Sequence, residues 1–379
     1  MAKGEIFTVQ VESIAAGGAG IARLNGKRIF IELTAPGDRA RGRIGRDHKT
    51  WAEGELLEIL EPSPLRTAPE CPLYGRCGGC SLQHLAYEAQ IEAKKDILRN
   101  AFTRIGGFIP PVIQVHGCAP FEYRNRVQFH FRNYLGFKEK KSGRLVTLSD
   151  CPVADTGIRN ALKEKRISPP AKKDRFNVYS RFATFLSEGG IEQGRVSILD
   201  RELSMDVKVF FQSNAAMLEL LIKDLITAAS AADKNLPLAD VYCGVGTFAA
   251  FLGAGFSGVD LVEENETALA LARENVQGEK IEYYPLSDTA WVKTLETSRK
   301  KPWGFMVLDP PREGLSGPLR EYLARSGPDL AAYVSCDPAT LARDSRFLCE
   351  GGYSLKELTL YDFYPQTAHI ESLALFSRR

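Results

Sequence analysis

The sequence predicts a multidomain α/β protein: a small N-terminal β-barrel, a central mixed α+β domain and a C-terminal parallel sheet with crossover helices. Short strand-like runs with glycine-rich turns fill the first 62 residues, and prolines at 62, 64 and 69 then break the chain. From Val207 onward, apolar strands alternate with helical segments. A chain of 379 residues is also too long for one ordinary core. We therefore expect domains at residues 1–62, 63–205 and 206–379.

The first domain is built from short, evenly spaced apolar runs, which is typical of a small barrel. We expect its strands at residues 6–14, 28–33, 38–44 and 51–60, with a turn at the glycines of residues 17–20. In the second domain, apolar and long side chains recur at helical spacing over residues 87–105. We expect this helix, at about residues 84–106, to pack on the C-terminal domain. The remainder, from Pro110 to about Met205, mixes strands with basic loops.

The composition is that of a globular protein, with 44% hydrophobic and 25% charged residues. The start of the chain lacks the apolar core of a signal peptide, and no segment has the length and apolarity needed to span a bilayer. We therefore expect no membrane association and a cytoplasmic location, where thiols stay reduced. Eight cysteines then point to metal binding, a cluster or catalysis rather than to disulfides, with Cys118 and Cys349 the best candidates for core filler.

The net charge is only +2, but basic residues gather in three stretches. Any one of these stretches fits a solvated surface as well as a binding site. Three of them ahead of a catalytic domain favour RNA as the partner, and nothing in the sequence points to an obligatory protein partner. The stretches are residues 23–49 (with Arg39, Arg41, Arg43 and Arg46), 124–144 (with Arg126, Arg132, Lys138, Lys140 and Lys141) and 159–181.

Cys336 follows a short apolar run, at a position where a strand ends and a turn begins. Asp309 ends a second such run, and strand ends in an open α/β sheet face one crevice. Glu371 precedes the last apolar strand and adds a carboxylate, so that a thiol and a possible base are available together. A free cysteine is more often a small buried hydrophobe. The position and the neighbours of Cys336 favour a nucleophile instead.

Cys71, Cys77 and Cys80 form a C-x5-C-x2-C run in which glycines allow the backbone to fold tightly around an inorganic core. Cys151 is the best candidate for a fourth ligand, because it too is followed by proline. Four thiolates suit either structural zinc or a [4Fe-4S] cluster. The spacing favours the cluster weakly, since zinc sites usually pair two C-x2-C knuckles.

A third set of residues predicts a cofactor site. An apolar strand runs through Tyr242 into a Gly-x-Gly turn at Gly244 and then into a helix, an arrangement that lets a ligand approach the backbone closely. Glu263, at the end of the next strand, is placed to accept hydrogen bonds from ribose hydroxyls, whereas Asp260 lies within that strand. The turn lacks the third glycine of the dinucleotide fingerprint, which favours S-adenosyl-L-methionine over a nicotinamide cofactor.

Together these motifs resemble the RNA uracil-C5 methyltransferases that act on ribosomal and transfer RNA, over nearly the whole chain. The first domain looks like the TRAM domain, an OB-like barrel that many members carry for RNA binding, and the last like a Rossmann-like class I methyltransferase. The matching residues are Cys71–His84, Phe210–Asn214, Asp240–Gly246, Asp309–Arg312, Val334–Pro338 and Pro365–Glu371.

The resemblance implies formation of 5-methyluridine. It favours 23S rRNA as the substrate, with a transfer RNA uridine as the alternative. Cys336 matches the thiol that adds to uracil C6 and Glu371 the base that removes the C5 proton. Asp309 matches a residue that also accepts a hydrogen bond from uracil N3. The cofactor positions that match are Gln212, Tyr242, Gly244, Thr247, Glu263, Ser287 and Asp309, and the [4Fe-4S] ligands are Cys71, Cys77, Cys80 and Cys151.

Two residues depart from the family pattern. Thr247 replaces a common asparagine, and Asp337 stands where asparagine usually follows the nucleophile. A carboxylate close to Cys336 would disfavour its thiolate, so we expect Asp337 to point away and cap the next helix.

Three other functions fit these motifs less well. An adenine-N6 methyltransferase places an aromatic residue after the Asp-Pro-Pro turn, where this chain has Arg312, and a cytosine-C5 enzyme carries its thiol in a Pro-Cys or Thr-Cys context. A non-catalytic iron-sulfur RNA-binding protein would not need Cys336, Glu371 and Glu263 intact.

Overall fold

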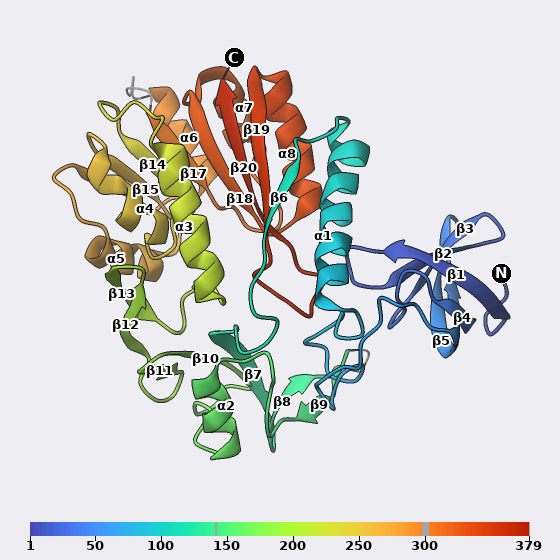
Figure 1. Ribbon diagram of the computed structural model, residues 1–379. Helices are drawn as coiled ribbons and strands as arrows, with labels where there is room; N and C mark the ends of the chain where they lie inside the picture. The colour runs from blue at the N-terminus through green and yellow to red at the C-terminus, as the bar shows by residue number, and fades with distance from the viewer. Residues whose placement is uncertain (141, 298–302, 379) are drawn as a thin grey trace.

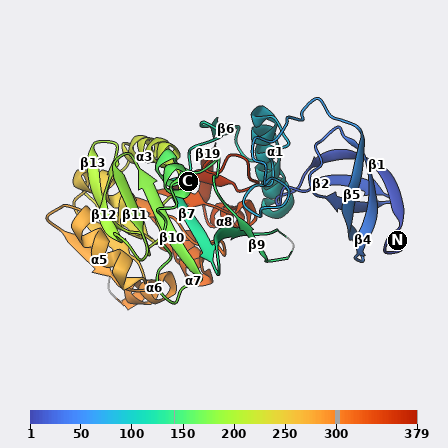
Figure 2. The ribbon, with the colours of Figure 1, turned by 90° about the horizontal axis from the view of Figure 1, so that it is seen from below.

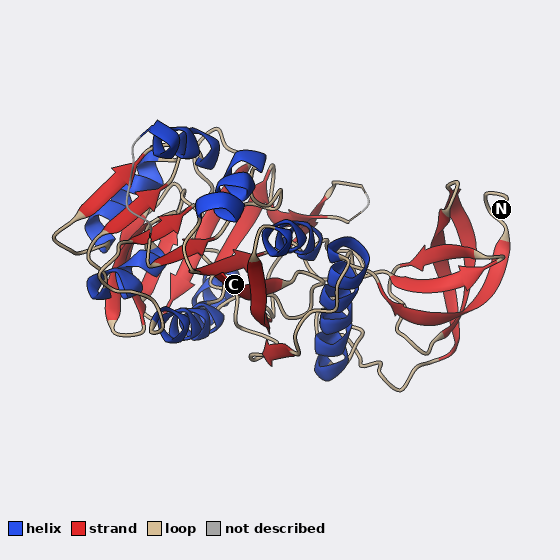
Figure 3. Cartoon of the chain, turned by 90° about the horizontal axis from the view of Figure 1, so that it is seen from above, coloured by secondary structure: helices blue, strands red, loops and turns tan. Residues whose placement is uncertain are grey.

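The computed structural model describes residues 1–140, 142–297 and 303–378. A barrel stands at one end of the molecule, a large sheet with helices on both faces forms the main body, and smaller sheets lie below it (Figure 1). Helix α1 (Tyr87–Ala101) lies between the barrel and the main body (Figure 3). The predicted barrel and the predicted α/β sheet are both confirmed, whereas the domain limits at residues 62 and 205 stay predictions.

The N-terminal barrel closes five strands in the order β1–β2–β3–β5–β4. Buried and exposed side chains alternate along β1, as a strand with one face on a core requires. The prediction missed β2, because it assigned Gly20 to a turn. A Cβ at Gly20 would lie 2.1 Å from the Thr34 hydroxyl, so this glycine serves close packing inside the barrel. The strands are β1 (Ile6–Ile14), β2 (Gly20–Leu24), β3 (Lys27–Ile31), β4 (Arg39–Asp47) and β5 (Trp51–Glu61).

The central part of the chain forms a five-stranded sheet in the order β11–β10–β7–β8–β9 and a separate hairpin of β12 and β13. Helix α2 (Thr156–Lys163) packs on β10, around a core that includes Phe129 and Phe176. In Figure 2, a view from below, these sheets lie in front of the large sheet. The strands are β7 (Arg126–Phe131), β8 (Leu135–Lys138), β9 (Leu145–Thr147), β10 (Arg175–Arg181), β11 (Thr184–Ser187), β12 (Gln193–Ile198) and β13 (Arg201–Asp206).

The large sheet has eight strands in the order β16–β15–β14–β17–β18–β20–β19–β6. The first five run parallel, but β20 is antiparallel to both neighbours, so the sheet is mixed rather than wholly parallel as predicted. The reason is that residues 362–370 join β19 directly to β20, with no crossover helix. The strands are β6 (Ile113–His116), β14 (Leu238–Val241), β15 (Val259–Val262), β16 (Ile281–Tyr284), β17 (Phe305–Leu308), β18 (Leu330–Ser335), β19 (Tyr353–Tyr361) and β20 (Glu371–Arg378).

Helices cover both faces of this sheet. Side chains of α3, α4 and α5 share one hydrophobic core with it, and those of α1, α6, α7 and α8 share the other. The central parallel strands are buried on both faces, which explains their nearly continuous apolar sequences. The helices are α3 (Ala215–Ala229), α4 (Thr247–Leu252), α5 (Glu266–Asn275), α6 (Asp288–Thr297), α7 (Gly317–Ser326) and α8 (Pro338–Glu350), with a short 3-10 turn, η2, at Gly253–Gly255.

The helix predicted for residues 87–105 consists of α1 followed by a π-helical segment, η1 (Phe102–Gly106). Helix α1 packs against α8, and strand β6 then joins the edge of the large sheet beside β19. Residues 87–116, which precede most of the central sheet in the sequence, therefore belong spatially to the main body.

Strand order reverses at β14, which has β15 on one side and β17 on the other. In open α/β sheets, ligands bind beyond the carboxyl ends of the strands at such a point. Gly244, Asp309 and Cys336 follow β14, β17 and β18. The fold thus brings together three predicted site residues that are up to 92 positions apart in the sequence (336 − 244 = 92).

Candidate active site

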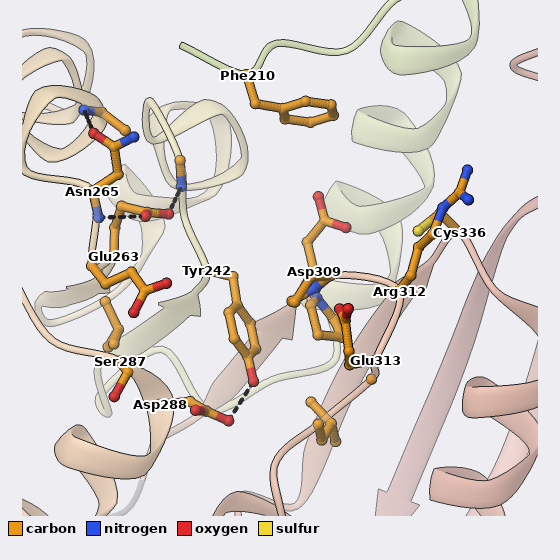
Figure 4. A pocket seen from close by; sticks show the side chains of 18 of the residues that line it. Phe210, Tyr242, Glu263, Asn265, Ser287, Asp288, Asp309, Arg312, Glu313 and Cys336 are labelled. Atoms are coloured by element: carbon orange, nitrogen blue, oxygen red, sulfur yellow. Dashed lines mark hydrogen bonds between the residues drawn. The ribbon is translucent and has the colours of Figure 1, made fainter. Parts of the chain in front are cut away.

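A cavity of about 950 Å³ opens at the carboxyl ends of β14, β17 and β18. Figure 4 shows Glu263, Asn265 and Ser287 at one end, Cys336 and Arg312 at the other, and Asp309 between them. The two halves therefore have different chemistry: hydroxyl, amide and carboxylate groups at one end, and a thiol at the other.

The first end is formed by the turns after β14 and β15. The Gly244 amide donates to Glu263 Oε2 at 3.0 Å, and the Asn265 amide donates to Glu263 Oε1 at 2.8 Å. Tyr242 has a φ of 64°, a left-handed conformation that is rare for a bulky residue, and its hydroxyl donates to Asp288 Oδ2 at 2.5 Å. The backbone after β14 is thus held in a strained turn at the cavity wall.

Six of the seven predicted cofactor residues line this cavity, and Thr247 does not. Thr247 is the first residue of α4, beyond the glycine turn. The side-chain oxygen of Gln212 is buried without a hydrogen-bond partner among the described residues. Because a buried acceptor of this kind needs a donor, a ligand with an amine or hydroxyl group fits this cavity. The six residues are Gln212, Tyr242, Gly244, Glu263, Ser287 and Asp309.

Toward the second end, the cavity is lined by three acidic groups: Cys336, Glu371 and the centrally placed Asp309. Burial, with the carboxyl groups of Glu371 and Asp309 adding to it, raises the pKa of the Cys336 thiol to about 12. Burial also raises the pKa of Asp309 to about 7, and that of Glu371 well above its usual range. The site therefore holds a neutral thiol beside carboxyl groups that bind protons readily.

Asp337, the residue after Cys336, points away from the thiol. Its Oδ1 accepts hydrogen bonds from the amides of Ala339 and Thr340, both at 2.9 Å, and so caps the N-terminus of α8. The expected orientation is confirmed, and the carboxylate that replaces the usual asparagine stabilises the helix.

Four further side chains line the thiol end, and none was a predicted site residue: Arg124, Arg312, Tyr364 and His369. The Arg124 guanidinium lies 5.8 Å from the Tyr364 ring centre, and an Arg312 nitrogen lies 3.4 Å from His369 Nδ1. Arg312 and His369 lay within motifs that the sequence had singled out. Arg124 lies outside these motifs. In the sequence it is one of many basic residues in the stretch 124–144, and nothing there marks it as an active-site residue.

Comparisons with known proteins identify the family. The model of tRNA (uracil-5-)-methyltransferases matches residues 186–379, and that of the TRAM domain matches residues 2–57. The chain belongs to the RNA uracil-C5 methyltransferase family. The predicted resemblance is confirmed, and the barrel is a TRAM domain.

Individual relatives agree with this assignment. A Treponema denticola protein named as an RNA methyltransferase is 33% identical over 98% of each chain. The 23S rRNA (uracil(1939)-C(5))-methyltransferase RlmD of Legionella pneumophila is 30% identical over 98% of this chain and 97% of its own. The Pyrococcus abyssi tRNA (uracil-54, C5)-methyltransferase in complex with S-adenosyl-L-homocysteine is 26% identical, with a TM-score of 0.72, over 98% of this chain and all of its own.

This methyltransferase therefore uses S-adenosyl-L-methionine to methylate C5 of uracil in RNA. The cavity lining offers hydrogen-bond acceptors, the buried Gln212 oxygen and the Glu263 carboxylate, which fits a methyl donor that carries amine and hydroxyl groups. Among the described residues, no helix has both the length and the apolarity to cross a bilayer.

The enzyme has a second cavity, of about 550 Å³, which we call the four-cysteine cavity because Cys71, Cys77, Cys80 and Cys151 all line it. The chain thus brings Cys151 to the three-cysteine run, as predicted. In the described part of the chain, no three His, Cys, Asp or Glu side chains are grouped closely enough to hold a metal ion. Four cysteine thiols are a ligand set that suits either structural zinc or a [4Fe-4S] cluster.

The basic stretches of the enzyme are less cationic than the sequence indicates. Arginines 39, 41 and 43 on β4 pair with glutamates 61, 58 and 55 on the adjacent strand β5. In the other two stretches, Lys140, Arg159, Lys173 and Arg181 also have carboxylate partners, and Lys141 lies outside the described residues. RNA remains the substrate, but the arginine-rich stretches of the sequence do not show where on the surface the RNA binds.

Proposed function

We propose that Cys336 and Glu371 carry out the methylation as nucleophile and base. The Cys336 thiol loses its proton to solvent and its sulfur bonds to C6 of uracil, which moves the C5–C6 π electrons into an enolate. S-adenosyl-L-methionine supplies an electrophilic methyl group: C5 bonds to that methyl as its bond to the sulfonium sulfur breaks, and S-adenosyl-L-homocysteine is the leaving group. The Glu371 carboxylate then takes the C5 proton, the C5–C6 double bond re-forms, and the C6–S bond breaks to release Cys336.

The single observation that carries this proposal is that Cys336 and Glu371 line one cavity at the ends of adjacent strands. The raised pKa of Glu371 suits its role, because a carboxylate with a high proton affinity is the better base. Asp309 lies in the same cavity, and we assign it to accept a hydrogen bond from uracil N3.

A uridine must leave its base stack to enter this cavity, which costs a few kcal/mol. Phe210 lines the cavity with 59% of its surface exposed, whereas its neighbour Phe211 is buried in the core. We therefore assign Phe210, and not Phe211, to stack on the extruded base or on a neighbouring one.

The test is to incubate the purified enzyme with RNA containing 5-fluorouridine, in which fluorine replaces the proton that Glu371 must remove. A covalent protein–RNA adduct should form, and peptide mapping should find it on Cys336. An adduct that persists in Cys336→Ala would remove Cys336 from this role.

For the substrate we propose a uridine of 23S rRNA. The support is the relative named RlmD, which matches nearly the full length of both chains. A transfer RNA uridine is the second candidate, because the solved relative from Pyrococcus abyssi acts on tRNA and has the same fold. Mapping 5-methyluridine by mass spectrometry in both RNAs from a deletion strain distinguishes them, and loss of the mark from tRNA alone would contradict the rRNA proposal.

We also propose that Cys71, Cys77, Cys80 and Cys151 hold a [4Fe-4S] cluster with a structural role, in an enzyme located in the cytoplasm. The cluster would join the loop at residues 71–80 to the segment before α2. Enzyme purified without oxygen should contain about four iron and four sulfide per chain. Zinc in a one-to-one ratio with no sulfide would contradict this assignment.

The TRAM barrel carries a surface that fits RNA better than its arginine-rich strand. Arg23, Arg28 and Trp51 form one outward row across β2, β3 and β5, where register pairs Arg23 with Arg28 and Arg28 with Trp51. Trp51 stacks on His48 at 3.8 Å, and the three residues of the row line a cavity of about 710 Å³. Arg23 pairs with Glu12 at 3.6 Å, and Arg28, directly opposite Arg23, adds a second positive charge that a bound anion would stabilise. We propose that a phosphate and a stacked base of the RNA bind along this row.

A further inference from the structure

Gln366 lies in the loop of residues 362–370, which joins β19 to β20 and ends immediately before Glu371. It is only 5% exposed, and its φ of 68° is left-handed, a conformation that costs free energy for any residue with a Cβ. Such a residue persists only where its surroundings hold it in place. The contacts of Gln366 therefore indicate what fixes this loop.

Residues 81–90, which lead from the four-cysteine cavity into α1, provide those contacts. The carbonyl oxygen of Gln366 accepts hydrogen bonds from the amides of Ser81 and Leu82, both at 2.9 Å. The amide of Gln366 donates to Gln90 Oε1 at 2.8 Å, and Gln90 Nε2 donates to Gln366 Oε1 at 3.0 Å. Ser81 Oγ accepts a further hydrogen bond from the Ala368 amide at 3.0 Å. Two segments more than 270 positions apart are thus joined by five hydrogen bonds.

A third segment, the β1–β2 loop of the barrel, also packs against Ser81 and Ala368. Gly18 of this loop has no room for a side chain. A Cβ at Gly18 would be 2.8 Å from Ser81 Oγ and 3.3 Å from Ala368 Cβ. On the other side, Lys94 of α1 pairs with Asp362 at 2.5 Å, and both side chains are fully buried. In Figure 1, the red loop below β19 and β20 runs beside the lower end of α1. The loop is therefore held along most of its length.

We propose that Gln366 is a positioning residue for the proton-transfer step. Its hydrogen bonds to residues 81–90 hold the 362–370 loop in the position from which Glu371 reaches the C5 proton. This inference rests on the proposed role of Glu371. Cys336 is carried by a different segment, the turn between β18 and α8. Loosening the loop should consequently slow removal of the C5 proton and leave addition of the thiol to C6 nearly unchanged.

The test uses Gln90→Ala, which removes two of the five hydrogen bonds, and Ser81→Ala, which removes one. Glu92→Ala, on the exposed side of the same helix, is the matched control. Two rates are measured: formation of the adduct with 5-fluorouridine RNA, which reports thiol addition, and turnover on ordinary RNA. Amide hydrogen exchange of residues 362–370 reports the loop directly.

For Gln90→Ala we expect adduct formation within about twofold of wild type and turnover lower by about tenfold or more. Covalent enzyme–RNA complex should accumulate on ordinary RNA, and exchange should rise in residues 362–370. Ser81→Ala should show the same pattern more weakly. Equal loss of both rates, or unchanged exchange in the loop, would overturn the proposal. A Glu371→Gln variant separates the two hypotheses: if it traps the complex and Gln90→Ala does not, only the positioning role of Gln366 is wrong.

Discussion

Cys336 and Glu371 lie side by side at the rim of the large sheet. Ser335 of β18 pairs with Ser372 of β20, so the next residue outward on each strand, Cys336 and Glu371, faces the same cavity. The antiparallel register thus puts the proposed nucleophile beside the proposed base. A shift of one residue would turn one of the two side chains to the opposite face of the sheet.

Replacing Glu371 by Gln should stop the reaction after methyl transfer. The amide cannot accept the C5 proton, so Cys336 cannot leave, and turnover should fall by about 10²- to 10⁴-fold. A covalent enzyme–RNA complex on ordinary uridine RNA should appear as a slower band in a denaturing gel. Glu357→Gln, on the exposed part of β19, is the control and should not trap RNA. Loss of turnover without a trapped complex would assign the proton to another base.

Adduct formation should depend steeply on pH. Because the pKa of the Cys336 thiol is raised to about 12, its thiolate fraction grows about tenfold per pH unit across the neutral range. The rate of adduct formation with 5-fluorouridine RNA, measured from pH 6 to 8, should therefore rise without a plateau. A rate that levels off near pH 7 would mean that the thiol is already ionised there.

Replacing Asp309 by Asn should stabilise the protein while impairing activity. Burial raises the pKa of Asp309 from 3.8 to about 7, so between these pH values the unfolded state has released a proton that the folded state keeps. The native carboxyl group therefore loses stability as pH rises through this window, and asparagine does not. At pH 8 the variant should unfold at a higher temperature, with a free energy of unfolding larger by roughly 4 kcal/mol, and the gain should vanish near pH 4. Equal stability at pH 8 would contradict the raised pKa.

The row on the barrel should contribute to RNA affinity. Trp51→Ala should weaken binding by about 1–3 kcal/mol, and Arg28→Ala should reduce the salt dependence of binding by about one phosphate contact. Arg41→Ala is the control, because Arg41 pairs with Glu58 at 2.8 Å. Titrations of RNA with each variant at several salt concentrations measure the binding affinity and its salt dependence. A larger loss for Arg41→Ala than for Arg28→Ala would locate the RNA on β4 instead.

The sequence alone determined the chemistry and the main elements. Strand ends before Asp309 and Cys336, the Gly-x-Gly turn at Gly244 and the run of cysteines are local patterns, and turns, caps and strand ends depend on neighbouring residues. The capping role of Asp337 could be predicted for the same reason. Gly20 was misassigned because its close contact, with Thr34, lies outside its own local sequence.

Only the tertiary structure decided what depends on residues distant in the sequence. It brought Arg124 to the active-site cavity, paired three arginines of β4 with glutamates of β5, and bound Gln366 to residues 81–90. Charges and buried hydrogen bonds act through space, so a basic residue in the sequence looks the same whether its partner is a carboxylate of the chain or a phosphate of RNA. Cys336 could be proposed as the nucleophile from the sequence, whereas the contacts that hold the loop before Glu371 could not be foreseen.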